Sequence, residues 1–113
     1  MRRAAALALL LVCTTSIAVA TGEGVAPRWD TMDPALQRIL AEASTNGDVT
    51  TTFEVIYQFT DSVSNEQMEL MRKIGLEHLA DAPLINGGLI SGTMPQILAL
   101  ASEPMILHLE LNR

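Results

Sequence analysis

The chain has 113 residues, enough for one ordinary domain, and a formal net charge of −6. An acidic chain is a poor match for nucleic acid or for an anionic membrane surface, so neither is expected as a partner. Its single cysteine, Cys13, lies near the N-terminus, which excludes a disulfide or a thiolate metal site in the rest of the chain.

The first twenty residues have the three parts of a secretory signal. Arg2 and Arg3 form a basic start, residues 4–12 form an apolar run, and Ala18-Val19-Ala20 ends in small residues. We expect cleavage after Ala20 and export to the extracellular space or periplasm, without stable membrane insertion afterwards. The alternative is a retained anchor, but the apolar run is short for a bilayer core of ~30 Å. Cleavage reduces seven basic residues to five against thirteen acidic ones, a net charge of −8.

Residues 21–52 are predicted to be a linker that carries one short helix, at about residues 33–43. Asp33 is a good N-cap and Pro34 suits the first helical position. The apolar stripe of this helix is narrow, and the turn signal Asn46-Gly47 follows it. We therefore expect the helix to be loosely attached ahead of a domain that occupies residues 53–113.

That domain begins with a strand and a helix. Apolar side chains alternate along residues 53–59, as in a strand with one buried face: Phe53, Val55, Tyr57 and Phe59. Ser64 and Gln67 form a capping-box pattern, and Gly75 suits the left-handed residue that ends a helix. Met68, Met71 and Ile74 share one face of this helix, which we expect to be core.

Three further strands and one helix complete the domain. Strands are predicted over residues 76–80, 84–92 and 105–111, with a bulge at Gly87-Gly88. Thr93 is expected to cap a helix that presents Ile97, Leu100 and Ala101 to the sheet. In the last strand Leu107, Leu109 and Leu111 would point to one face and Ile106 to the other. The sequence alone therefore leaves open which face of this strand is buried.

The order strand, helix, strand, strand, helix, strand predicts an α+β, ferredoxin-like βαββαβ fold. It would place a four-stranded antiparallel sheet under two helices, preceded by the short N-terminal helix. The other face of the sheet would be uncovered and would carry Glu54, Ile56 and Gln58. Such a face is either a docking surface or simply solvated.

No catalytic, metal or cofactor site is expected, and the chain is predicted not to be an enzyme. His78 and His108 both lie on predicted strands, but a zinc site needs three or four ligands and no carboxylate has suitable spacing. Asn86-Gly87-Gly88 lacks the pattern of a phosphate-binding loop.

Several segments carry a resemblance to a known family. They are Val55-Ile56-Tyr57-Gln58-Phe59, Ser64-Asn65-Glu66-Gln67, Leu84-Ile85-Asn86-Gly87, and residues 100–110. In this order and spacing, residues 54–112 resemble the propeptide (prosegment) inhibitor domain that precedes secreted subtilisin-like serine proteases.

The resemblance implies a role as inhibitor and intramolecular chaperone of a subtilisin-like serine protease. In the family the open sheet face packs on two helices of the protease, acidic side chains cap those helices, and the C-terminal segment enters the active-site cleft. It implies these docking residues: Glu54, Ile56, Gln58, Glu77, Asp81, Glu110, Leu111, Asn112 and Arg113.

The chain departs from the family pattern at its C-terminus, because several more residues normally follow the last strand. Two alternatives therefore stay open. The chain could be an N-terminal fragment of such a protease without independent function. It could also be a small secreted ferredoxin-like domain that binds a ligand or self-associates.

Overall fold

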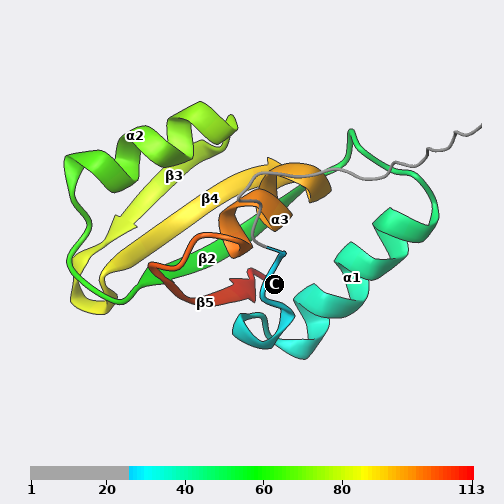
Figure 1. The fold of residues 1–113 in the computed structure, drawn as a ribbon, viewed down its shortest axis with the longest axis horizontal. Coiled ribbons are helices and arrows are strands. Elements are labelled where there is room, and N and C mark those ends of the chain that lie inside the picture. Colours follow the sequence, from blue (N-terminus) through cyan, green and yellow to red (C-terminus); the bar gives the residue numbers. More distant parts are fainter. Residues whose placement is uncertain (1–25) are drawn as a thin grey trace, which may run out of the picture.

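A four-stranded antiparallel sheet and three α-helices make up residues 26–113, the part of the chain that the computed structural model describes (Figure 1). The predicted signal sequence and its cleavage site after Ala20 lie outside these residues. The helices are α1 (Pro34–Thr45), α2 (Asn65–Ile74) and α3 (Met94–Ala101). The strands are β2 (Thr52–Phe59), β3 (Glu77–Ala82), β4 (Gly87–Thr93) and β5 (Ile106–Leu111).

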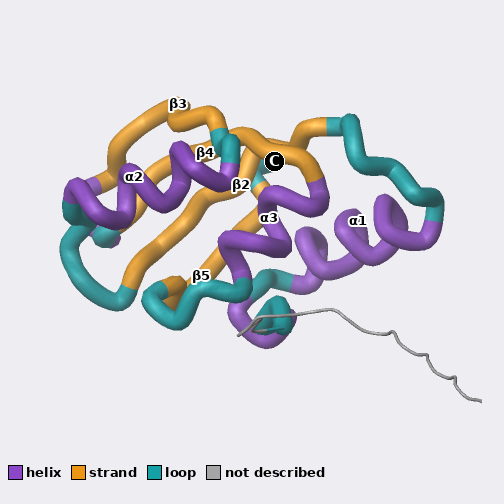
Figure 2. Tube along the Cα trace, turned by 45° about the horizontal axis from the view of Figure 1, so that its top comes forward, coloured by secondary structure: helices purple, strands orange, loops and turns teal. Residues whose placement is uncertain are grey.

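The strands lie in the order β3-β4-β2-β5, so β3 and β5 form the two edges of the sheet. The helices lie on one side of the sheet, with α3 between α2 and α1 (Figure 2). The predicted first strand is confirmed, with Val55, Tyr57 and Phe59 fully buried beneath the helices. Because side chains alternate along a strand, the residues between them face the opposite, uncovered side.

The helix signals in the sequence are confirmed at both ends of α2. The N–H of Gln67 donates to Ser64 Oγ (3.3 Å), and the N–H of Ser64 donates to Gln67 Oε1 (2.6 Å). Gly75 ends the helix with φ +100°, a conformation that glycine adopts without strain. At α3 the N–H of Thr93 donates to Gln96 Oε1 (2.9 Å). The three α3 residues predicted to face the sheet are fully buried: Ile97, Leu100 and Ala101.

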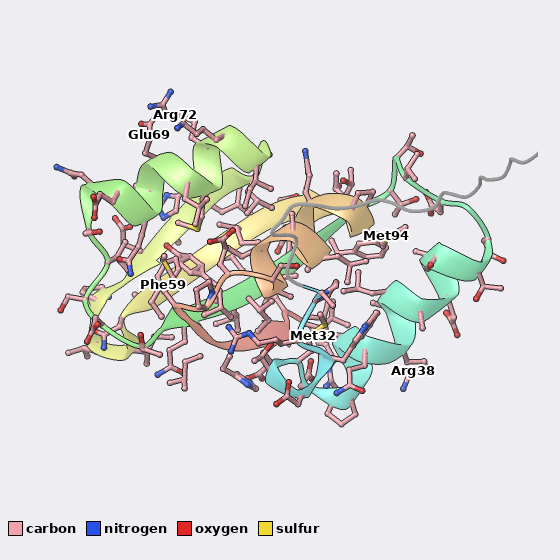
Figure 3. All side chains as sticks on the ribbon, in the orientation of Figure 1. Met32, Arg38, Phe59, Glu69, Arg72 and Met94 are labelled. Atoms are coloured by element: carbon pink, nitrogen blue, oxygen red, sulfur yellow. The ribbon has the colours of Figure 1, made fainter. Side chains whose placement is uncertain are left out.

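The outer surfaces of the helices are polar. Figure 3 shows Arg38 pointing away from the sheet on α1, and the ion pair of Glu69 with Arg72 on the outer side of α2. Met71 belongs to the core, whereas Met68 and Ile74 pack at its margin. In residues 26–113 no helix is both long and apolar enough to span a bilayer.

The prediction of a loosely attached N-terminal helix is wrong. Leu36 and Leu40 of α1 are fully buried and belong to the same hydrophobic core as Tyr57 and Ile97. The segment ahead of α1 also binds the sheet, because Met32 forms a parallel bridge with Leu109. The compact part therefore begins well before residue 53. The stripe on α1 looked narrow because its partners, α3 and β5, come much later in the sequence.

A β-bulge explains the conflicting parity of β5. Phe59 pairs with Ile106, but Gln58 pairs with His108, which leaves Leu107 as an extra residue. Ile106 and Leu109 are therefore both buried, while Leu107 is 51% exposed. Strict alternation of Leu107, Leu109 and Leu111 on one face is not observed.

The predicted bulge at Gly87-Gly88 is also wrong, because both glycines pair regularly with β2. The bulge of that hairpin lies in β3, where Leu79 is the extra residue between His78 and Ala80. A Cβ on Gly88 would lie 2.3 Å from the carbonyl oxygen of Ala80 and 2.9 Å from Tyr57 Oη. The glycine is thus required by the close approach of its neighbours. The strand starts at Gly87, since Pro83–Ile85 forms a 3₁₀ turn instead.

Candidate functional site

The uncovered face of the sheet, which we call the open face, is built from three rows of directly paired residues. Residues opposite one another on adjacent strands share a face. The first row is Glu54, Ser91 and Glu77, read from β2 to β3. The middle row is Glu110, Ile56, Leu89 and Ala80, and the third row is His108, Gln58, Gly87 and Ala82.

The open face is acidic around a small apolar centre. Glu54, Glu77 and Glu110 are exposed, and they surround the partly buried Ile56 and Leu89. None of the four strands contains a lysine or an arginine. An array of carboxylates around apolar side chains favours a partner that presents positive charge or helix N-termini beside apolar groups.

Two neutral or weakly basic side chains contact these carboxylates. The amide Nδ2 of Asn112 donates to Glu54 Oε1 at 3.0 Å, and His108 Nε2 lies 3.5 Å from Glu110 Oε1. Neither partner is a lysine or an arginine. The carboxylates therefore stay available to a partner.

The structure brings five of the nine predicted docking residues together on this face: Glu54, Ile56, Gln58, Glu77 and Glu110. Asp81 does not share the face, because it pairs with Gly88, which is opposite the buried Tyr57. Its carboxylate lies instead 3.1 Å from His78 Nε2 on the helix side of β3. The bulge at Leu79 changes the parity that the sequence suggests for this strand.

The remaining predicted residues form a C-terminal segment that is held in place. The N–H of Leu111 donates to Asp33 Oδ1 at 3.1 Å, and Arg113 Nη2 lies 3.2 Å from Asp33 Oδ2. On the other side, the backbone N–H of Asn112 donates to the carbonyl of Glu54 at 3.0 Å. Residues 111–113 thus lie between α1 and β2 and do not extend freely.

Asp33 joins this segment to α1, since the same carboxylate also accepts the N–H of Leu36 at 3.2 Å. Burial alone would raise the pKa of Asp33, but the hydrogen bonds from Leu111, Leu36 and Arg113 hold it below its usual value. The sequence identified Asp33 as a helix cap but gave no sign of its second role.

Three apolar residues of the surface were not predicted to be there. Leu89 lies at the centre of the open face, and the alternation of β4 could have placed it there. Leu79 and Leu107 are exposed because each is the extra residue of a bulge. Bulges leave no clear sequence signal in strands of this length.

The described part of the chain offers no second constellation for chemistry. His78 and His108 lie on opposite edges of the sheet, and no group of three or more His, Cys, Asp or Glu side chains in residues 26–113 could hold a metal ion. Tyr57 is buried, and its hydroxyl has no hydrogen-bond partner among these residues. Burial and the nearby Asp81 carboxylate raise the pKa of Tyr57 to about 12.

Comparison of the chain with protein families, with curated proteins and with solved structures found no match.

Proposed function

We propose that this protein is a non-enzymatic inhibitor and folding assistant of a secreted subtilisin-like serine protease. The observation that carries the proposal is the open face, where Glu54, Glu77 and Glu110 surround Ile56 and Leu89 without a lysine or arginine on any strand. The sheet order β3-β4-β2-β5 and the antiparallel pairing support a ferredoxin-like arrangement, which the resemblance also implies.

The carboxylates suit the surface that a propeptide-like domain must recognise. The N-terminus of a helix carries partial positive charge and unpaired N–H groups, so a carboxylate placed there is favourable by about 0.3–1 kcal/mol. Glu54 and Glu77 lie in the same row, one on each side of Ser91. They can therefore meet two neighbouring helix ends while Ile56 and Leu89 cover apolar side chains between them.

The C-terminal segment contributes to this function only after a rearrangement. Entry of Asn112 and Arg113 into an active-site cleft requires the contacts of Arg113 with Asp33 and of Asn112 with Glu54 to break. Arg113, Asn112 and Glu54 are exposed, and contacts of exposed side chains contribute little to stability. Docking of the open face needs no such change, so we assign it the larger share of the affinity.

The proposal is tested with a panel of secreted subtilisin-like proteases. Each protease is assayed for inhibition by the purified protein, and for recovery of activity after denaturation with and without it. We expect inhibition or assisted refolding at micromolar concentrations or lower for at least one protease. Absence of both effects across the panel would contradict the proposal and would favour a fragment or an unrelated binding domain.

A further inference from the structure

One turn of the protein presents leucine to solvent in a fixed position. Pro83–Ile85 forms the 3₁₀ turn between β3 and β4, in which Leu84 is 100% exposed and Ile85 is 39% exposed. The N–H of Asn86 donates to the carbonyl of Pro83 at 3.1 Å, and the carbonyl of Asn86 accepts the N–H of Phe59 at 2.9 Å. The backbone of the turn is therefore tied to the sheet, which fixes where Leu84 leaves the chain.

The turn extends the open face at one end. Ala82 and Gly87, which flank it, belong to the third row of that face. The exposed Leu107 precedes His108 of the same row, on the opposite edge of the sheet. Figure 1 shows the β3–β4 turn and the start of β5 toward the same side of the molecule. This end of the face thus has exposed apolar side chains beside a row that contains no carboxylate, whereas the first row, with Glu54 and Glu77, forms an acidic end.

This arrangement limits what can cover the turn. A second copy that packed face to face with the acidic rows aligned would oppose carboxylates with carboxylates, and an anionic bilayer would be repelled by the same groups. A protein that presents positive charge opposite the acidic end and an apolar recess beyond it fits both ends at once. In the unbound protein the leucine side chain is fully in water and contributes no burial energy. Its burial in such a recess would therefore add its full hydrophobic free energy to binding.

We propose that the Pro83–Ile85 turn is an apolar anchor, and that Leu84 enters a hydrophobic recess on the protease that binds the open face. This inference rests on the proposed function and deepens it, because it fixes the orientation of the partner along the sheet. The acidic end of the open face contacts the positive groups of the protease. The Pro83–Ile85 turn contacts the protease at the other end of the face.

The test compares two exposed apolar residues at opposite ends of the molecule. Leu84→Ser removes the anchor, while Val49→Ser changes a 55% exposed valine in the connection between α1 and β2. The inhibition constant is measured for wild type and both variants against a protease that the wild type inhibits. Burial of a leucine predicts a weakening of about tenfold to a hundredfold for Leu84→Ser and less than twofold for Val49→Ser.

Two controls distinguish a role of Leu84 in binding from protease inhibition as such. Thermal unfolding should show the same midpoint for both variants and wild type, since neither side chain is in the core. An unchanged inhibition constant for Leu84→Ser would overturn the anchor and leave the proposed function standing. If the wild type inhibits no protease, both fail together. A wild-type dimer that Leu84→Ser dissociates in sedimentation would assign the turn to a second copy and overturn the anchor.

Discussion

The backbone N–H of Leu111 donates to the carboxylate of Asp33 at 3.1 Å, and this hydrogen bond joins β5 to the N-cap residue of α1. Arg113 and Leu36 contact the same carboxylate. One side chain that is only 14% exposed thus links the N-terminal helix to the C-terminal segment. This contact makes α1 and the sheet one structural unit.

Replacement of Asp33 should therefore destabilise the protein more than loss of an ordinary helix cap. We expect Asp33→Ala to lower the free energy of unfolding by about 1–3 kcal/mol, because the N–H groups of Leu36 and Leu111 both lose their acceptor. Asp33→Asn keeps a cap acceptor but loses the charge that pairs with Arg113, so its effect should be smaller. Urea unfolding of the two variants measures the difference. Wild-type stability of Asp33→Asn would contradict a role for the charge, and equal losses for the two variants would contradict a role for the neutral acceptor.

The same carboxylate predicts a dependence on acid. Because its pKa is lowered in the folded protein, the ionised form is bound more favourably there than in the unfolded chain. The resulting stability is present above the unfolded pKa of about 3.9 and is lost as the pH falls through the folded pKa. Unfolding free energies measured from pH 6 to pH 2 should fall less steeply for Asp33→Asn than for wild type.

Truncation of a buried side chain in α1 tests whether this helix belongs to the core. Leu40 is fully buried, so Leu40→Ala should reduce the free energy of unfolding by about 2–5 kcal/mol. Ala41→Gly, at an exposed position of the same helix, should cost only about 1 kcal/mol through lost helix propensity. Similar small effects of both changes in thermal or urea unfolding would mean that α1 is loosely attached after all.

The buried hydroxyl of Tyr57 predicts an unusual response to removal of a polar group. Since this hydroxyl has no hydrogen-bond partner among the described residues, Tyr57→Phe should leave stability unchanged or raise it by about 1 kcal/mol. The folded pKa of about 12 lies above the unfolded value of about 10, so wild-type stability should fall as the pH rises through this interval. Tyr57→Phe should lack that alkaline loss, and an identical pH profile would refute the assignment.

Gly88 tests the packing of the β3–β4 hairpin. Gly88→Ala places a methyl group against the Ala80 carbonyl and the Tyr57 ring, so we expect a loss of about 2–4 kcal/mol or failure to fold. Gly47→Ala is the control, because its φ is +67° but nothing lies within 4 Å of the added Cβ. That variant should lose only about 1 kcal/mol from backbone strain. Comparable losses in urea unfolding would show that close packing at Gly88 is not the cause.

Local patterns in the sequence predicted most of the elements, because their causes are local. The alternation from Phe53 to Phe59 and the capping box of Ser64 with Gln67 each lie within one element, and both are observed. The failures share a different cause. The bulges at Leu79 and Leu107 arise from pairing with another strand, and the burial of Leu36 and Leu40 depends on packing against later elements.

The same distinction applies to the candidate site. Glu54, Ile56 and Gln58 could be placed on the open face from parity alone, since β2 is regular. Asp81 was misplaced because the bulge that precedes it reverses the parity of β3. The restraint of Arg113 by Asp33 spans almost the whole described chain, and no short-range pattern indicates it.

The most direct test of the open face as a protease-binding surface is the inhibition constant of a charge-reversed variant. Glu54→Lys with Glu77→Lys is compared with wild type and with Glu42→Lys plus Glu66→Lys, which gives the same net charge but alters exposed positions on α1 and α2. Circular dichroism confirms that all three are folded. We predict at least a tenfold weakening for the first variant, reduced at high salt, and little change for the second. Equal inhibition by all three proteins would contradict docking through this face.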